Sequence, residues 1–590
     1  MKKFPHKLRE NKSNKFAKYF FFFDTETQFE KIDNQEHHTL KVGFVKDAAS
    51  DSGIFFDNVK YFWDYITQGT EVGTTYVYAH NMHFDFNIVQ GFIKLYEYGY
   101  EITLAVLESG TFIVAATNRK SRKRLIFLDT FNYFKMSVER MGEMLGLPKG
   151  KINFETCSLE ELKTYCKRDV EIIELIMRRW KQFLHKHKLG VSQYTIASQA
   201  FTAFRHKYMD SNIYIHNHPE AIRLEQKSYR GGRTEAFHIG ALENILVVDV
   251  NSLYPFIMQF NQFPSKLLGY TDNLSIRTLL HLLNQDLLVI ADCEVQTSLN
   301  SIGLRHKINN TEKLIFPVGS FRATLTNPEL FLLLRTGAKI KEVYELSWYK
   351  PEYIFKKYVK ELYELRLKYQ KENDYTFQSM VKDLLNSLYG KFGQRERELE
   401  VLGETSIDDV FREQIYDLTT GERYTIYSFG GKIWRQRITQ EESINSFTAV
   451  ASYVTAYART YLYLLMQIPN TVYYCDTDSL MIPKEELTLF GHFLGENIGQ
   501  LKIDYGGEKC YIFGAKDYWI DDVVKRKGIK RNAIEVSENT FQQLQFHKTK
   551  SLIKEGFVDR VIIELVEKKC ERIYDKGIVL PNGKVEPLSL

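Results

Sequence analysis

The chain has 590 residues, too many for a single hydrophobic core, so several domains are expected. Apolar residues make up 44% of it, as in a globular protein, and a net charge of +5 does not by itself indicate a polyanionic partner. Six cysteines without a C-x-x-C pair argue against a zinc knuckle or a disulfide framework and favour a reducing, cytoplasmic setting. The apolar run Tyr19 to Phe23 is shorter than a signal-peptide core, and no stretch approaches the roughly 20 apolar residues of a membrane span.

Four short apolar runs each lead into acidic or polar residues, and they occupy residues 18–27, 74–89, 243–255 and 471–480. Each run is predicted to be a buried strand that presents carboxylates at its end. Helical patterns lie between them. Residues 158–180 begin with Ser158 and Glu161 in capping-box spacing, and residues 351–392 favour two helices hinged near residues 372–375. The alternation of strands with helices predicts a mixed α/β fold.

The first group of candidate metal ligands comes from the first two runs and the capped helix. Asp24 and Glu26 are two residues apart on a strand, so both side chains leave the same face. Asp85 follows the second run, and Tyr165 and Asp169 are four residues apart on one helix face. Four gathered carboxylates repel one another, and hard divalent cations such as Mg²⁺ relieve that repulsion. Two such ions would activate a water molecule and stabilise the leaving oxygen of a phosphodiester, with the Tyr165 hydroxyl orienting the water.

Each of these pieces alone has an ordinary structural explanation, because D-x-E is common and a helical Y-x-x-x-D is usually a solvated face. The ordered set D-x-E, Y-x-H-N-x-x-F-D and Y-x-x-x-D resembles the three exonuclease motifs of proofreading DNA polymerases, which have a ribonuclease H-like fold. The resemblance implies that the metal ligands are Asp24, Glu26, Asp85 and Asp169. It implies that a single-stranded DNA end contacts Asn81, Phe84, Thr130 and Phe131. The segment "LPKGKINF" resembles the K-x-x-hydrophobic motif of one branch of that family and adds a catalytic residue, Lys149.

A second acidic group has three members, which end one apolar run or lie in a strand–turn–strand context: Asp249, Asp476 and Asp478. These carboxylates can form another two-metal site. Lys382, Asn386 and Tyr389 lie at i, i+4 and i+7 on one helix face, where an ammonium group, an amide and a ring suit a triphosphate and a base. For that segment alone, an amphipathic helix with a solvated face is the alternative.

The segments "DVNSLYP", "KDLLNSLYG" and "YCDTDS" resemble motifs A, B and C of family B DNA polymerases. The resemblance implies that Asp249 and Asp478 bridge two metals, that Asp476 is a peripheral ligand, and that the Val250 carbonyl completes a metal shell. The nucleotide-binding residues that it implies are Ser252, Leu253, Tyr254, Lys382, Asn386 and Tyr389. Tyr254 would lie under the sugar, where its ring leaves no room for a 2′-hydroxyl group, so a preference for deoxynucleotides is expected.

Three further segments extend the resemblance to family B polymerases. "SYRGGRTEAF" resembles the Y-x-G-G linker that holds the template strand, "TAYAR" the T-x-x-A-R element, and "AKDY" the K-x-Y element that steadies the primer end. The DNA-binding residues that they imply are Tyr229, Gly231, Gly232, Thr455, Arg459, Lys516 and Tyr518.

The resemblance divides the chain into an exonuclease domain, residues 1–190, and a right-hand polymerase domain, residues 191–590. The expected parts of the polymerase domain are a palm (about 191–264 and 436–531), a first insertion (about 265–350), fingers (about 351–393), a second insertion that forms a β-hairpin (about 394–435) and a thumb (about 532–590). Insertions at these two positions occur in the protein-primed subgroup, the replicative polymerases of small bacteriophages. There they bind a terminal protein and encircle DNA during strand displacement.

We therefore expect a DNA-directed DNA polymerase with a 3′–5′ proofreading exonuclease, replicating a linear viral or plasmid genome as a monomer in the host cytoplasm. Its expected cofactors are two Mg²⁺ ions in each centre, with Mn²⁺ as an alternative because both ions accept oxygen-rich shells. Its expected partners are template and primer DNA, deoxynucleoside triphosphates and a terminal protein that acts as primer. A single-stranded DNA-binding protein is a further candidate partner, and no membrane is expected. The alternatives are a nucleic-acid-primed family B polymerase and a degenerate DNA-binding replication scaffold.

Overall fold

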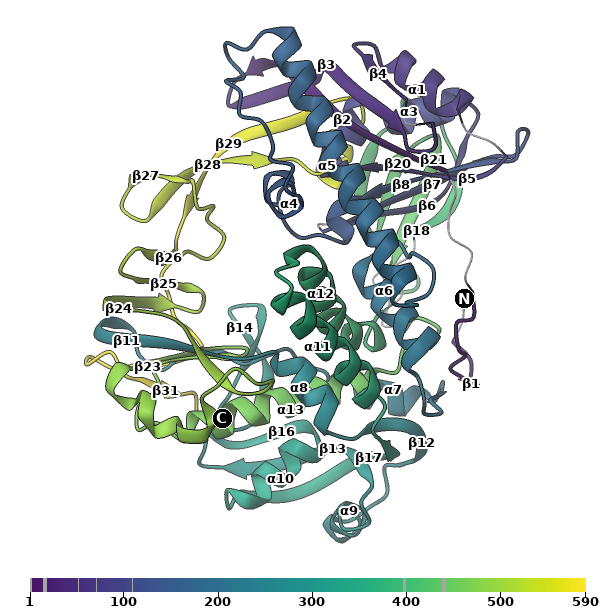
Figure 1. Ribbon diagram of the computed structural model, residues 1–590. Coiled ribbons are helices and arrows are strands. Elements are labelled where there is room, and N and C mark those ends of the chain that lie inside the picture. Colours follow the sequence, from purple (N-terminus) through teal and green to yellow (C-terminus); the bar gives the residue numbers. More distant parts are fainter. Residues whose placement is uncertain are drawn as a thin grey trace.

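The computed structural model describes residues 3–13, 19–50, 52–69, 72–108, 110–395, 399–437 and 442–590. Figure 1 shows two sheet-based halves, one above the other, with helices between them and with strands of the C-terminal segment running from the lower half to the upper. Both halves mix helices and strands, as the sequence predicts. Within the described residues, no helix combines the length and the apolar character needed to cross a membrane.

The upper half is built on a ten-stranded sheet whose centre is parallel. Its parallel strands are β2 (Tyr19–Ile32), β5 (Gly73–Ala79) and β8 (Lys123–Asp129). Phe21 and Phe23 enter the core on one face and Phe22 the core on the other, because successive side chains of a strand point to opposite faces. The sheet is therefore buried on both sides, which explains the unbroken aromatic run at the start of β2.

Helix α5 (Leu159–Lys186) packs on β2 and on its antiparallel neighbour β3 (Gln35–Asp47). The predicted capping box at its start is confirmed, since the Ser158 side chain accepts from the Glu161 main chain and the Glu161 side chain from that of Ser158. This cap fixes the first turn, and the apolar stripe behind it presses the helix onto the sheet.

The segment expected to be a separate thumb contributes strands to the upper sheet. Strands β27 (Ile534–Ser537), β28 (Thr540–Phe546) and β29 (Val561–Lys569) continue it, and β29 pairs antiparallel with β3. In Figure 1 these yellow strands lie beside the purple ones. β3 and β29 are more than 500 residues apart in the sequence, so no local sequence pattern predicts that they pair.

The lower half contains a seven-stranded sheet, in which β11 (Gly240–Val250) lies between β23 (Ser479–Pro483) and β24 (Leu501–Gly514). A short strand, β22 (Tyr474–Asp476), pairs with β23 to form the hairpin that carries the paired aspartates. Helix α13 (Thr448–Met466) contributes many buried side chains beneath this region.

Two antiparallel helices, α11 (Lys356–Lys371) and α12 (Tyr375–Phe392), lie between the halves (Figure 1). The break between them falls within the hinge predicted from the sequence. Asp374 is the N-cap of α12 and accepts a hydrogen bond from the main-chain N–H of Phe377.

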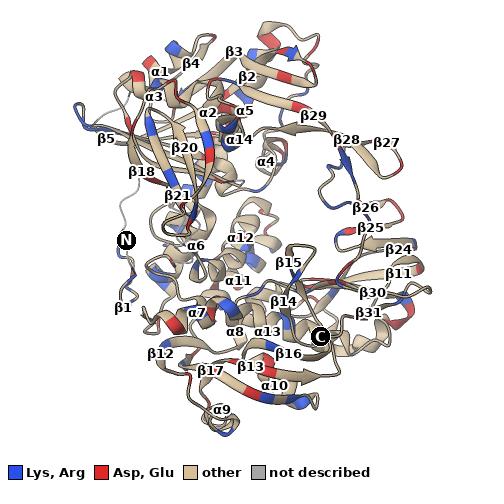
Figure 2. Ribbon diagram, turned by 180° about the vertical axis from the view of Figure 1, so that it is seen from behind, with Lys and Arg blue, Asp and Glu red and all other residues tan. Residues whose placement is uncertain are grey.

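The first expected insertion forms most of a six-stranded sheet, with strands β12 (Phe263–Thr271), β13 (Leu288–Thr297), β16 (Gly319–Thr326) and β17 (Lys339–Glu352). It also carries helices α9 (Ile276–Leu283) and α10 (Asn327–Arg335). Helix α7 (Pro219–Ser228) packs against β13 and β16, and the view from behind in Figure 2 shows these elements together.

The second expected insertion is a four-stranded sheet and not the predicted hairpin. Its strands are β18 (Leu399–Glu404), β19 (Phe411–Tyr416), β20 (Arg423–Phe429) and β21 (Lys432–Arg437), while residues 396–398 of the expected range lie outside the described residues. The Phe429 ring lies 4.7 Å from that of Phe92, so the sheet shares a core with the upper half. Two extra strands give the insertion enough apolar surface to dock, which an isolated hairpin lacks.

Candidate active sites

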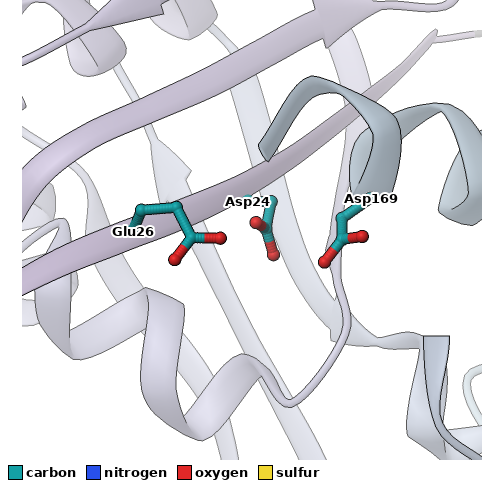
Figure 3. A group of neighbouring side chains, drawn as sticks. All are labelled: Asp24, Glu26 and Asp169. Atoms are coloured by element: carbon teal, nitrogen blue, oxygen red, sulfur yellow. The ribbon is translucent and has the colours of Figure 1, made fainter. Parts of the chain in front are cut away.

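The first acidic group predicted from the sequence comes together where β2 meets α5 (Figure 3). Asp24 and Glu26 come from β2 and Asp169 from α5, and one ligand oxygen of each lies within 4.8 Å of the others. The two strand acids lie in the middle of β2 and not at its end, because β3 keeps β2 paired as far as Ile32. Elsewhere in the described ranges, no group of three His, Cys, Asp or Glu residues meets this spacing.

Asp85 lies beside this group, on helix α2 (Met82–Ile88). Its Oδ1 atom accepts hydrogen bonds from the Thr25 main-chain N–H at 3.0 Å and from the Thr25 hydroxyl at 2.7 Å. Burial raises the pKa of Asp85 to about 8. The side chain is thus tied to the strand that carries the cluster, and its role as a metal ligand stays a prediction.

Burial and mutual repulsion raise the pKa values of the clustered acids. The pKa of Glu26 rises to about 7, first through burial and then through the charge of Asp169. The pKa of Asp24 rises well above its usual value for the same two reasons. Carboxyl groups that resist ionising together are stabilised in the ionised form by a divalent cation, and an all-oxygen donor set suits Mg²⁺. The three residues therefore fit the predicted metal.

Lys149 places a positive charge against this cluster. Its Nζ atom lies 2.5 Å from Oδ2 of Asp169 and 4.5 Å from the centre of the Tyr165 ring. Burial lowers the pKa of Lys149, but the adjacent Asp169 outweighs that effect and leaves it above the usual range. The structure thus brings together Lys149 and Tyr165, the two predicted supporting catalytic residues, with the predicted metal ligand Asp169.

Asp129 is a site residue that the sequence reasoning missed. It ends β8, and its carboxylate accepts from the main-chain N–H groups of Asn81 and Met82, each at 3.0 Å, and of Phe131 at 2.8 Å. These bonds fix the start of α2 and so orient the helix that carries Asp85. Burial raises the pKa of Asp129 to about 6. The signal was present, since "RLIFLD" is another apolar run that ends in an acid.

A cavity of 730 Å³ opens in front of the first acidic group, and two of the predicted DNA contacts, Asn81 and Phe84, line it. Thr130 does not line it. Its side chain is fully buried and its hydroxyl donates to the carbonyl of Ala79 at 3.2 Å, so the prediction that it touches DNA is corrected. The 3-10 turn after β8 directs this side chain inward. Phe131 is half-buried, with the Nζ atom of Lys135 4.4 Å from its ring centre.

The second acidic group is assembled by the antiparallel strands β11 and β23. Asp249 is paired with Ser479, and the main-chain N–H of Val250 donates to the carbonyl of Asp478 at 2.8 Å. Burial, then Asp249, then Asp476 raise the pKa of Asp478 to about 7. Burial is also the first cause of the raised pKa of Asp249. The electrostatics of the first site therefore recur here with acids from distant parts of the chain.

Asp476 has protein partners on both carboxylate oxygens. Oδ1 accepts from the Thr234 hydroxyl at 2.9 Å, and Oδ2 lies 2.6 Å from Nζ of Lys516. Lys516 lies in the turn between β24 and β25 (Asp517–Ile520), and its side chain is more than half exposed. Tyr518 is 7% exposed, and its hydroxyl is hydrogen-bonded to that of Tyr505 at 2.7 Å. The predicted DNA contact by Tyr518 stays a prediction, and most of its ring lies in the core of the sheet.

The segment after Asp249 leads into helix α8 (Leu253–Phe260). Ser252 is its N-cap, with a φ of 53°, and Leu253 is buried, so this segment can offer main-chain groups to a ligand. Pro255 lies in the first turn of α8, where its missing main-chain N–H costs no helical hydrogen bond. Arg366 was missed. Its guanidinium donates to the Ser252 hydroxyl at 2.7 Å from the facing helix α11, a tertiary contact without a sequence signal.

Helix α12 presents the predicted nucleotide-binding face toward this point. Lys382 and Asn386 are exposed. Burial raises the pKa of Asp249, and the positive charges of Lys502 and, to a smaller extent, Lys382 oppose that rise. The rings of Tyr254 and Tyr389 are stacked, with centroids 4.8 Å apart and planes 21° apart. Lysine, amide and aromatic groups thus converge beside the second acidic group, and the roles assigned to them stay predictions.

The Y-x-G-G segment lies against the hairpin that carries Asp476. A Cβ atom added to Gly232 would lie 3.0 Å from the Thr477 side chain, so glycine is needed there for the close approach of two protein segments. Gly231 is exposed with open space around it, and Tyr229 is half-buried. Gly231 and Tyr229 are therefore the residues of this segment that can contact a ligand.

Two predicted DNA contacts on α13 are buried instead. Thr455 is 2% exposed, and its hydroxyl donates to main-chain carbonyls of its own helix. Arg459 is 4% exposed, and its guanidinium donates to Arg230, Gly231 and Glu329. The direct contact of these two residues with DNA stays a prediction. Arg459 holds the linker, because its charge is satisfied inside the protein.

Comparison with known protein families identifies the family of the chain that carries these two sites. The family model "DNA polymerase type B, organellar and viral" matches residues 157–468, which is more than half of the chain. The chain belongs to this family. The match spans motifs A and B, whereas Asp476 and Asp478 lie just beyond its end.

Curated relatives of this type B chain carry polymerase names. A "Probable DNA polymerase" of Neurospora intermedia is 25% identical over 446 residues, covering 71% of this chain and 43% of the relative. A "DNA polymerase" of Kluyveromyces lactis is 24% identical over 389 residues, covering 61% of this chain and 37% of the relative. The chain thus spans less than half the length of these relatives.

Solved structures show that the type B chain has the fold of Phi29 DNA polymerase. The complex of that protein with primer-template DNA and incoming nucleotide matches with a TM-score of 0.69 and 16% identity, covering 94% of this chain and 100% of that one. A complex of the same protein with single-stranded DNA matches with a TM-score of 0.68 and 15% identity over the same shares. The predicted fold class, a ribonuclease H-like domain followed by palm, fingers and thumb with insertions, is therefore confirmed.

Proposed function

We propose that this type B chain is a DNA-directed DNA polymerase with a separate 3′–5′ proofreading exonuclease. Polymerisation is assigned to the Asp249 and Asp478 site and proofreading to the Asp24, Glu26 and Asp169 site. The observation that carries the proposal is the convergence of two independent groups of partly buried acids with raised pKa values, one in each half of the molecule. The presence of these acids argues against a degenerate scaffold.

Both sites suit divalent metal ions, which when bound would lower the pKa of the attacking oxygen and neutralise charge on the phosphates. Asp249, Asp478 and the Val250 carbonyl would hold them in the polymerase site, with Asp476 at the periphery. Lys382 would neutralise a triphosphate while Tyr254 and Tyr389 position the sugar and base, because phosphoryl transfer depends mainly on positioning and charge neutralisation. In the exonuclease site, Tyr165 would orient the water molecule.

Two substitutions test the division of labour. Asp249→Ala is expected to lower primer extension at least about 100-fold and to leave the degradation of single-stranded DNA unchanged. Asp24→Ala is expected to lower the degradation of single-stranded DNA by a similar factor and to leave primer extension unchanged. Matched controls are Glu243→Ala on β11 and Glu30→Ala on β2, which remove exposed acids from the same two strands. If either active-site substitution abolished both activities in a folded protein, the assignment of separate centres would be wrong.

We propose further that a terminal protein supplies the priming hydroxyl group and that the enzyme displaces the non-template strand of a linear viral or plasmid genome in the host cytoplasm. Support comes from the two insertions, which are folded sheets at the expected positions. The competing proposal is a polymerase primed only by nucleic acid. Incubation with labelled deoxynucleotide and a candidate terminal protein separates the two, since only the first predicts a nucleotide covalently linked to protein.

A further inference from the structure

A large cavity lies away from both acidic groups, between helix α7, strands β13 and β16, and the hairpin of β14 (Leu304–Ile308) and β15 (Thr311–Ile315). Figure 2 shows α7 and this hairpin on the same side of the molecule. The cavity volume is 1390 Å³, above the range of about 300 to 1000 Å³ for small-molecule pockets. It has room for a segment of a polymer.

The lining of this cavity is basic. Seven lysine and arginine side chains line it against three acidic ones, and two more acids, Glu329 and Glu345, pair with lining arginines from behind, which leaves an excess of two positive charges. No Phe, Tyr or Trp is among its described lining residues, so it offers no platform on which bases could stack. The ligand chemistry that fits is a row of phosphates.

Two buried carboxylates hold the basic side chains in place. Asp292 lies 2.9 Å from Arg322 and 3.4 Å from Lys227, and Glu345 lies 2.5 Å from Arg223 and 3.7 Å from Lys227. The acids are only 3% and 6% exposed, whereas the three basic side chains are 42% to 50% exposed. Each of these three basic side chains is therefore held by a buried carboxylate and remains partly exposed. Such pre-organisation lowers the conformational entropy lost on binding an anion.

The cavity adjoins the linker beside the polymerase site. Arg305, which lines it, donates to the carbonyl of Tyr229 at 2.7 Å, and Arg230 of the same linker also lines it. Two residues further on, Gly232 lies against Thr477 of the hairpin that carries Asp476 and Asp478. A strand held in the cavity would thus be led directly to the second acidic group.

We propose that this cavity binds the phosphodiester backbone of the single-stranded template before the template reaches the Asp249 and Asp478 site. The inference rests on the proposed polymerase function. Binding there is independent of base sequence, because the contacts are between fixed cations and phosphates. The same chemistry would accept a free polyphosphate, which the experiment distinguishes from DNA.

The test measures affinity in EDTA, by fluorescence anisotropy, for primer-template duplexes with 5′ template overhangs of about 2 and about 12 nucleotides. The wild type is expected to bind the long overhang more tightly. The double variant Lys227→Gln/Arg305→Gln is expected to lose about 10-fold affinity for the long overhang only, and to lower the slope of log K against log salt by about 0.7 for each cation removed. Lys227 is chosen because Asp292 and Glu345 each keep an arginine partner without it.

The matched control is Lys60→Gln/Arg119→Gln, which removes two exposed, ion-paired cations from the upper half. Thermal unfolding verifies that both double variants fold. An unchanged response to overhang length in Lys227→Gln/Arg305→Gln would overturn the proposal. A second result would also overturn the proposal: wild-type protein that binds inorganic tripolyphosphate at this site but whose DNA affinity does not depend on overhang length. The ligand would then be free polyphosphate.

Primer extension by the wild type in Mg²⁺ is measured separately. If primer extension were absent, the proposed polymerase function would be refuted. If extension were intact but overhang length had no effect on affinity, only the proposed role of the cavity would be refuted.

Discussion

The guanidinium group of Arg459 donates a hydrogen bond to the main-chain carbonyl of Gly231 across 2.9 Å. The same group lies 2.8 Å from the buried carboxylate of Glu329, so one side chain joins helix α13, the linker and helix α10. Arg459 thus braces the Y-x-G-G segment from inside the protein.

Arg459→Met is expected to lower the free energy of unfolding by about 3 kcal/mol, because Glu329 keeps only the more distant Arg230, at 3.6 Å, as a charged partner. Denaturant unfolding of the variant checks the value. Adding Glu329→Gln should recover part of the loss, since it removes the uncompensated buried charge. Arg140→Met, at an exposed ion pair, should stay within about 0.5 kcal/mol of the wild type, and an equal effect of the two single substitutions would contradict the brace.

The apparent Mg²⁺ affinity of the polymerase site is expected to depend on pH. Asp478, with a pKa of about 7, is mostly protonated below that pH and must lose its proton to bind a cation. Affinity should therefore rise about 10-fold per pH unit up to about pH 7 and level off above it. Magnesium titrations of primer extension at several pH values measure this.

Asp476→Asn provides the control for this pH dependence. It removes a like charge that raises the pKa of Asp478, so the break in the profile should move to lower pH. A profile that is flat below pH 7, or a break that does not move, would show that another group controls the affinity.

Tyr254→Val is expected to raise the incorporation of ribonucleotides relative to deoxynucleotides by about 100-fold, equivalent to about 2.7 kcal/mol. The Tyr254 ring is stacked on Tyr389, and under the proposed function it would occupy the space that a 2′-hydroxyl group needs. Single-turnover incorporation of the two nucleotide types measures the ratio. Tyr254→Phe keeps the ring and should keep the discrimination, whereas full discrimination by Tyr254→Val would refute the steric role.

Phe429→Ala is expected to weaken the docking of the second insertion on the upper half by about 3 to 5 kcal/mol. The Phe429 ring is fully buried between Phe92, at 4.7 Å, and Trp434, at 5.3 Å. Hydrogen exchange should become faster in β18 to β21, and primer extension should fall on duplex that must be displaced but not on open template. Tyr416→Ala, at an exposed position of the same sheet, is the control, and equal exchange in the two variants would contradict the docking.

Local patterns were sufficient for features that neighbouring residues determine. The capping box of Ser158 and Glu161, the break before Asp374 and the mixed α/β class follow from short-range hydrogen bonding and side-chain periodicity. They failed for the pairing of strands. β2 extends beyond Glu26 because it pairs with β3, the next strand in the chain, and the upper sheet is completed by β29, which is remote in the sequence.

The sequence by itself determined which residue types could supply chemistry: the spaced acids of two groups, Lys149 and Tyr165 near one of them, and a lysine and tyrosine on one face of α12. Only the tertiary structure decided which side chains are available. Thr130 and Arg459 are buried in it, and Asp85 accepts hydrogen bonds from Thr25. Asp129 and Arg366 contact the sites although no motif contains them. The physical reason is that exposure, pKa and hydrogen-bond partners depend on what packs against a residue from distant parts of the chain, and motif spacing carries no record of that packing.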